Sequence, residues 1–203
     1  MARKTRKDVI RDFRTEQILE AARVVIAKRG YAKTTLARIA REAGVAKGTL
    51  YLYFENKEAL LAAIHAWGHE RLMERVREAS EAEDSAERML RATVRATLEY
   101  FDGELAFARA VGSYPAIGPA GTSPGSQEIR DRIAAYTRFL AALLAQGVRA
   151  REFRRHDPAE AAVFLTHLTY AEVGARVLGV GAEGPERAAN RVLDYFLNGV
   201  CAR

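Results

Sequence analysis

Residues 34–57 constrain the fold of this 203-residue chain more than any other stretch. Thr34 or Thr35 can cap a short helix, because the apolar residues that follow recur at helical spacing. Gly44 is expected to end that helix, since glycine adopts the left-handed conformation without a steric penalty. A second short helix begins at Lys47. Two helices joined by such a turn predict a helix-turn-helix, whose second helix enters the DNA major groove.

The run GVAKGTLYLYFENKEAL at residues 44–60 resembles the signature of tetracycline-repressor-type (TetR family) regulators. The similarity begins near Thr15 and extends to about Leu61. It implies a homodimeric transcriptional regulator, most often a repressor, that binds a palindromic operator and is released by a small-molecule effector in its C-terminal domain. Leu52 departs from the pattern, because relatives often carry there an aromatic or polar residue that touches the DNA backbone.

Side chains in and beside the second helix can contact DNA. Leu50 and Phe54 should point inward, so that Tyr51 and Tyr53 point outward, where phenols can bond to phosphates or lie against base edges. Gly48 would let the backbone approach DNA closely. Ordinary packing of the tyrosines as partly buried aromatics is the alternative, and the residues that read bases stay undecided. The candidate DNA-binding residues are Thr34, Thr35, Lys47, Gly48, Thr49, Tyr51, Tyr53 and Lys57.

The positive charge of the chain lies in its first part. Residues 1–60 hold 14 Lys and Arg against 7 Asp and Glu, a net charge of +7, whereas residues 61–203 hold 18 against 19. This asymmetry is typical of a phosphate-binding module joined to a neutral one. Six cations between Arg3 and Arg14 predict a basic N-terminal arm. The arm is either a solvated tail or a segment that follows the minor groove or the phosphates.

Helical periodicity predicts an all-α fold of about nine helices, since no alternating strand pattern competes with it. Residues 1–55 are expected to form a three-helix helix-turn-helix domain with the basic arm, and residues 56–203 an antiparallel bundle for ligand binding and dimerisation. Asn56, Asp84 or Ser85, and Asp157 followed by Pro158 provide N-caps, and glycines provide ends. The other helices are expected at residues 15–29 (ended by Gly30), 56–80, 85–101 (ended by Gly103), 104–111, 126–146 (ended by Gly147), 158–178 and 186–199.

The last two helices are apolar over most of their circumference, which is more than packing on one side requires. One apolar face of each is expected to serve the core and the other a second copy of the chain, in a four-helix interface with two-fold symmetry. A pair buried within a monomer is the alternative. The candidate interface residues are Phe164, Leu168, Ala171, Val192, Tyr195 and Phe196.

The resemblance implies that a small molecule binds between the helices of the second domain. The Pro- and Gly-rich residues 112–125 are either a linker or a gate over that pocket. Core packing is the alternative role for each pocket candidate. The candidate effector-pocket residues are Trp67, Phe101, Phe107, Arg109, Tyr114, Tyr136, His167 and Tyr170.

Other classes of protein find less support in the sequence. An enzyme on a helical bundle is not favoured, because no phosphate-binding glycine loop or Gly-x-Ser-x-Gly elbow is present. His65 and His69 have a spacing that could share a metal, but further ligands are lacking, so no metal or cofactor is expected. No apolar run of membrane-spanning length and no signal-peptide core occur, so a cytoplasmic location is expected. A DNA-binding architectural protein, whose second domain only dimerises, remains a competing interpretation.

Overall fold

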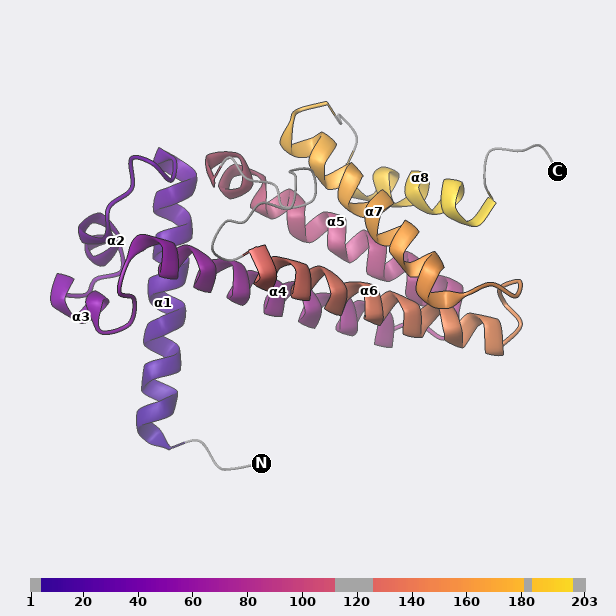
Figure 1. The fold of residues 1–203 in the computed structure, drawn as a ribbon, viewed down its shortest axis with the longest axis horizontal. Helices are drawn as coiled ribbons and strands as arrows, with labels where there is room; N and C mark the ends of the chain where they lie inside the picture. Colours follow the sequence, from indigo (N-terminus) through magenta and orange to yellow (C-terminus); the bar gives the residue numbers. More distant parts are fainter. Residues whose placement is uncertain (1–4, 112–125, 181–183, 199–203) are drawn as a thin grey trace. The chain divides into compact units, whose positions relative to one another are not determined.

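The computed structural model describes residues 5–111, 126–180 and 184–198, and these form eight α-helices and no strand (Figure 1). The predicted all-α class, with a helix-turn-helix followed by a helical domain, is confirmed. Predicted residue Tyr114 and the proline-rich segment lie outside the described residues. The helices are α1 (Arg6–Arg29), α2 (Leu36–Glu42), α3 (Lys47–Tyr51), α4 (Lys57–Glu81), α5 (Ala86–Val111), α6 (Ser126–Arg149), α7 (Pro158–Val177) and α8 (Pro185–Asn198).

The first of two compact units comprises Met1–Gly68 and Ala106–Gly112, so the predicted division after residue 55 falls inside it. Its apolar core takes side chains from α1 to α4 and from the end of α5. Gly30 and Gly44 end α1 and the α2 segment with positive φ angles of 83° and 65°. Both glycines therefore have the conformation that their predicted role requires.

The N-terminal segment differs from the prediction, because α1 begins at Arg6 rather than near Thr15. Thr5 and Asp8 form a capping box: the Thr5 amide donates to the Asp8 carboxylate at 2.9 Å, and the Asp8 amide donates to the Thr5 hydroxyl at 3.3 Å. Such reciprocal bonds satisfy the free amides of a first turn. Residues 6–14 are therefore the first turns of α1, although the sequence predicted that this helix begins only near residue 15.

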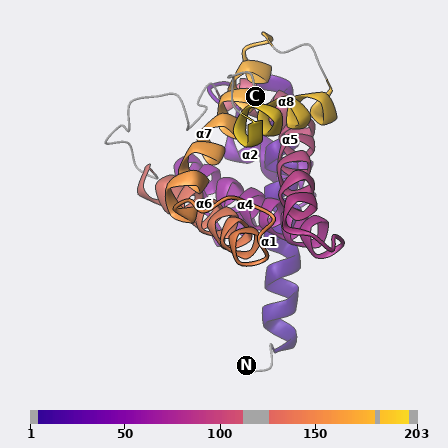
Figure 2. The same cartoon turned by 90° about the vertical axis from the view of Figure 1, so that its right-hand side faces the viewer.

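The second unit comprises His69–Leu105 and Ser113–Arg203 and has a separate core. Apolar side chains from the second half of α4, most of α5, and α6, α7 and α8 meet in it. Figures 1 and 2 show α6 and α7 side by side, with α8 packed on α7. Predicted N-caps are present here as well: Asp157 accepts from the amide of Ala159 at 2.8 Å, and Ser85 accepts from that of Arg88 at 3.3 Å.

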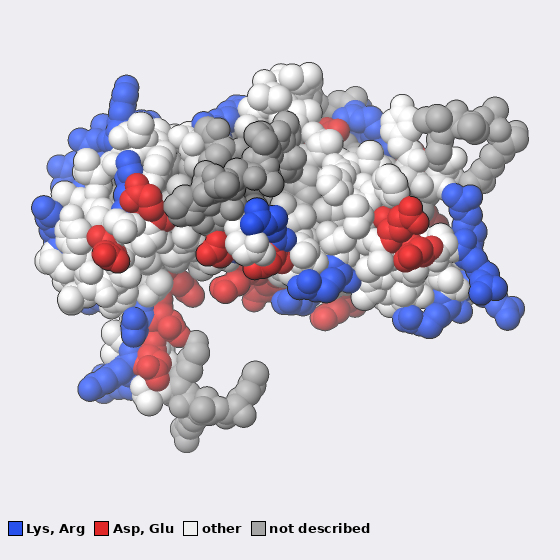
Figure 3. Space-filling view, viewed as in Figure 1, with Lys and Arg blue, Asp and Glu red and all other residues white. Residues whose placement is uncertain are grey.

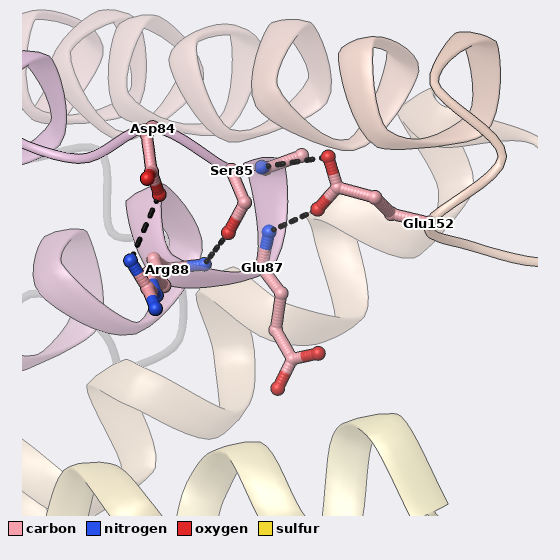
Figure 4. Close-up of polar contacts among 6 residues, drawn as sticks. Asp84, Ser85, Glu87, Arg88 and Glu152 are labelled. Atoms are coloured by element: carbon pink, nitrogen blue, oxygen red, sulfur yellow. Dashed lines mark hydrogen bonds and ion pairs between the residues drawn. The ribbon is translucent and has the colours of Figure 1, made fainter.

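A long-range contact caps the start of α5 (Figure 4). The two carboxylate oxygens of Glu152, in the connection after α6, accept from the backbone amides of Ala86 and Glu87, each at 3.1 Å. A carboxylate at this position satisfies free amides and interacts favourably with the helix dipole. Glu152 thereby joins the end of α6 to the beginning of α5.

Two glycines do not end helices as predicted. α5 continues through Gly103 to Val111, which merges the predicted helices 85–101 and 104–111. α6 continues through Gly147 to Arg149. Arg151, two residues after the end of α6, has a positive φ of 62°, the conformation that was expected at Gly147. Across the part of the chain with described structure, none of the helices is both long and apolar enough to cross a bilayer.

Candidate DNA-binding interface

Residues 34–46 form a fixed helix and turn. Thr35 caps α2, since its hydroxyl accepts from the Arg38 amide at 3.4 Å, and the apolar side of α2 is buried in the core of the first unit. In the turn, the Val45 amide donates to the Ala40 carbonyl at 2.9 Å. From α1, the Gln17 side-chain amide donates to the Ala43 carbonyl, also at 2.9 Å. These bonds hold the C-terminal end of α2 and thereby set where α3 begins.

α3 is held in place mainly by Leu50. The helix has five residues, and the Leu50 side chain is fully buried in the core of the first unit. The Leu50 carbonyl also accepts from the amides of Tyr53 and Phe54, both at 3.0 Å, in the turn that follows. A helix this short is not stable in isolation, so tertiary packing must supply its stability.

The outward face of α3 presents a cation, a glycine and a phenol. Lys47 and Gly48 are exposed, and Tyr51 is 47% exposed with its ring 5.9 Å from the Lys47 ammonium. A Cβ added to Gly48 would meet no atom within 4 Å, so packing within the chain does not require glycine there. Leu52, at the end of α3, is 80% exposed. This face can therefore supply a charge, a hydroxyl and close backbone approach to a ligand.

Three of the predicted DNA-binding residues are used by the fold itself. Thr34 is buried, and its hydroxyl donates to the Gly30 carbonyl at 2.9 Å, so its side chain does not lie on the outward face. Tyr53 is half-buried against the core. The Lys57 ammonium donates to the Tyr31 carbonyl at 3.1 Å and lies 4.2 Å from the centre of the Tyr31 ring. The remaining candidates are the exposed residues Thr35, Lys47, Gly48 and Tyr51 and the half-buried Thr49.

Further positive side chains lie exposed on the first unit. Figure 3 shows Lys and Arg atoms along the outer edge of the first unit, where Figure 1 places α2 and α3. Lys33 is exposed shortly before α2 and Arg41 is exposed within it, and neither was singled out by the sequence motif. Gln17 was also missed as a positioning residue. The partner of Gln17 is the Ala43 carbonyl, 26 positions away, and no local sequence pattern indicates a contact between such distant residues.

The predicted effector-pocket residues are divided between the two units. Phe101, Tyr136 and Tyr170 meet in the second unit, with the Tyr170 ring centre 5.8 Å from that of Phe101 and 6.0 Å from that of Tyr136. The Tyr136 hydroxyl is hydrogen-bonded to that of Thr97 at 2.9 Å, and burial raises the Tyr136 pKa to about 12. Burial also raises the Tyr170 pKa, so both tyrosines are neutral phenols at physiological pH.

The other described pocket candidates lie elsewhere. Phe107 is buried in the core of the first unit, and Trp67 packs against that core. Arg109 is exposed in the same unit. His167 is exposed on α7, where its Nδ1 is 2.7 Å from the Val163 carbonyl oxygen. The described candidates are therefore divided: Trp67, Phe107 and Arg109 belong to the first unit, and Phe101, Tyr136, His167 and Tyr170 to the second.

The predicted interface residues separate into two groups. Phe164, Leu168 and Ala171 lie exposed along one face of α7 at spacings of four and three residues. Tyr195 of α8 is also exposed, at 57%. Val192, in contrast, is buried in the core of the second unit, because it shares a face of α8 with buried Ala188 and Ala189, and Phe196 is partly buried there.

The helix-turn-helix has recognised relatives. Residues 18–64 match the family described as bacterial regulatory proteins, tetR family. The fatty acid metabolism regulator protein of Bacillus subtilis is 45% identical over 62 residues, which are 30% of this chain and 32% of that protein. The matched segments span about a third of the length of this and further curated relatives.

Solved structures extend the similarity to the whole fold. The transcriptional regulator FadR from Bacillus subtilis, solved in complex with stearoyl-CoA, is 25% identical, with a TM-score of 0.77 over 92% of this chain and 99% of that one. FadR from Bacillus halodurans is 24% identical, with a TM-score of 0.78 over 100% of both chains. The likeness to the second structure concerns the fold alone.

Proposed function

Because residues 18–64 make this chain a member of the TetR family of bacterial regulatory proteins, we propose that it is a DNA-binding transcriptional repressor. The observation that carries the proposal is the outward face of α3. There Lys47, Gly48 and Tyr51 lie exposed on a helix that buried Leu50 anchors. The major groove admits an α-helix, and such side chains can contact its base edges and phosphates. In this proposal α3 reads the operator.

The proposed repressor is a homodimer that uses the exposed faces of α7 and α8. Phe164, Leu168 and Tyr195 are 61%, 40% and 57% exposed. Large apolar side chains grouped on a surface are typical of a site that a partner covers. A two-fold dimer presents two copies of α3 symmetrically. The operator is therefore expected to be palindromic, with half-sites about one helical turn, or a multiple of it, apart.

The proposed effector is a long-chain acyl-CoA bound by the second unit. Support comes from the 25% identical regulator of the same fold that was solved with stearoyl-CoA. Phe101, Tyr136 and Tyr170 are proposed to border the site, since they are the predicted pocket residues that meet in this unit. Binding would release DNA if the effector prefers a dimer conformation that the operator disfavours.

Selection of binding sequences from random duplex DNA, at about 0.15 M salt, tests the proposed function. A recovered inverted repeat with two related half-sites supports a symmetric, sequence-specific regulator. Salt-sensitive binding without any recovered sequence would instead favour the architectural interpretation, because phosphate contacts alone carry no sequence information.

Opposite behaviour is expected from two substitutions on the outward face of α3. Tyr51→Ala should weaken binding to the selected repeat by about 1–3 kcal/mol, and binding to unrelated duplex much less, if the phenol contacts a base edge. Lys47→Gln should weaken binding to both duplexes alike and reduce the slope of log K against log salt by about one per protomer, if the ammonium contacts a phosphate. Competition titrations over a salt series measure both effects. The reverse pattern would exchange the two assignments.

The effector assignment predicts a ligand-dependent gain in thermal stability. Stearoyl-CoA should raise the Tm, because a ligand that binds only the folded state stabilises it by RT ln(1 + [L]/Kd), which is about 2.7 kcal/mol at 100 times Kd. The same compound should weaken binding to the selected repeat. Coenzyme A alone is the control for the head group. Unchanged Tm and unchanged DNA affinity at saturating stearoyl-CoA would exclude this effector while leaving the DNA-binding proposal intact.

A further inference from the structure

The first turns of α1 extend well beyond the core of the first unit. Residues 6–14 are all exposed, and the first buried side chain of α1 is that of Ile18. The capping box of Thr5 and Asp8 fixes the start of the helix, and the Thr15 hydroxyl donates to the Arg11 carbonyl at 2.9 Å. At 1.5 Å per residue, the exposed residues 6–14 correspond to about 14 Å of helix. Packing within the unit does not account for this extension.

Three cations form one stripe along this extension. Lys7, Arg11 and Arg14 are spaced four and three residues apart, which places them on one face of the helix. Continuing the spacing leads to Ile18 and Ala22, which are fully buried in the core of the first unit. The cations therefore project toward the side of α1 that other helices of the unit cover further along the chain.

That side is the side of the helix-turn-helix. Gln17, one turn after Arg14, donates to the carbonyl of Ala43 at the end of α2. In Figure 3 the Lys and Arg atoms of the protruding part of α1 lie toward α2 and α3, and Asp and Glu atoms lie on its other side. Asp8 and Asp12, which are also four residues apart, share a different face of the same helix. The positive face of the extension therefore lies on the same side of α1 as α2 and α3.

We propose that Lys7, Arg11 and Arg14 form a second phosphate-binding surface, which binds the DNA backbone beyond the base pairs that α3 reaches. The inference rests on the proposed DNA-binding function and adds a site to it. Charge complementarity supports it, because Lys7 and Arg14 are about 10 Å apart along the helix axis, and duplex DNA carries one negative charge per about 1.7 Å. These contacts lengthen the footprint and raise affinity without reading sequence.

The test compares two variants with equal loss of charge. The first is K7Q/R11Q/R14Q, which retains the helix because glutamine is a good helix former. The control is R149Q/R155Q/R187Q, which removes three exposed arginines of the second unit. Circular dichroism checks that helical content is retained. Affinity for the selected repeat and for unrelated duplex is measured from about 0.05 to 0.2 M salt, on duplexes trimmed to the repeat and on duplexes extended by about half a turn at each end.

The first variant is expected to bind both sequences roughly 10- to 100-fold more weakly at about 0.15 M salt, with a slope of log K against log salt reduced by about three per protomer. The wild type, but not this variant, gains affinity on the extended duplex. A charge-retaining variant, R11K/R14K, keeps most of the affinity. If the wild type binds the selected repeat specifically but the first variant and the control have equal slopes of log K against log salt, the inference of a second phosphate-binding surface is wrong, while the proposed DNA-binding function stands. No binding by the wild type would overturn the proposed function as well.

Discussion

Replacing Leu50 with alanine is expected to destabilise the first unit by about 2–5 kcal/mol and to abolish sequence-specific DNA binding. Leu50 is the buried side chain of five-residue α3, and its exposed fraction is 0%. Truncation removes apolar contacts and leaves a cavity that neighbouring side chains fill only in part. Because so short a helix depends on packing, α3 should lose its fixed orientation even where the rest of the unit stays folded.

Leu52→Ala is the matched control for this result. It is the same chemical change two residues later, at a side chain that is 80% exposed, and surface changes of this kind stay within about 0.5 kcal/mol. Urea unfolding of both variants, followed by far-ultraviolet circular dichroism, measures the stability difference, and titration with the selected duplex measures binding. Comparable stability losses for the two variants would show that Leu50 is not the anchor of α3.

Gly147→Ala is expected to destabilise the second unit by about 1–3 kcal/mol, although alanine is the better helix former. Gly147 lies within α6, where an added Cβ would overlap the ring of Phe153 and come within 3.0 Å of the Cβ of Ala86. Phe153 packs against the core of this unit, and its amide donates to the Gly147 carbonyl at 3.2 Å. The ring must therefore move, and overpacking of this kind typically costs about 1–3 kcal/mol.

Gly103→Ala, the same substitution inside α5, should have the opposite sign. An added Cβ at Gly103 meets no atom within 4 Å, so only the gain in helix propensity remains, at most about 1 kcal/mol of stabilisation. Thermal and urea unfolding of both variants give the comparison. A stability for Gly147→Ala at or above that of the wild type would mean that the Phe153 ring relocates without loss, and that the glycine is not needed for close packing.

The prediction of the helix-turn-helix succeeded where its signals were local. Thr35, Gly30 and Gly44 have the capping and turn geometry expected of them, and Leu50 and Phe54 are buried as predicted. Each of these roles depends on the residue and on neighbours a few positions away. For the same reason the N-terminal segment could have been predicted better, because the Thr5 and Asp8 pair is visible in the sequence as a capping box.

Errors arose where a residue's role depends on a distant partner. Glycines often end helices, yet Gly103 and Gly147 both lie inside helices. Glycine is suited to position 147 because the ring of Phe153, in the connection after α6, packs where a Cβ would lie. Lys57 was predicted as a DNA-binding residue, and nothing in the sequence indicated that its ammonium donates to the carbonyl of Tyr31. Val192 was expected at an interface, and it is part of the core.

The sequence by itself determined the all-helical class, the helix-turn-helix and the concentration of positive charge in the first 60 residues. Periodicity, caps and charge are properties of contiguous residues, so they can be read before the chain is folded. Only the tertiary structure decided which candidates lie next to one another. It brought Phe101, Tyr136 and Tyr170 together, assigned Phe107 to another core, and directed the positive face of the α1 extension toward the side of α3. Those relations join residues far apart in the chain, and packing alone fixes them.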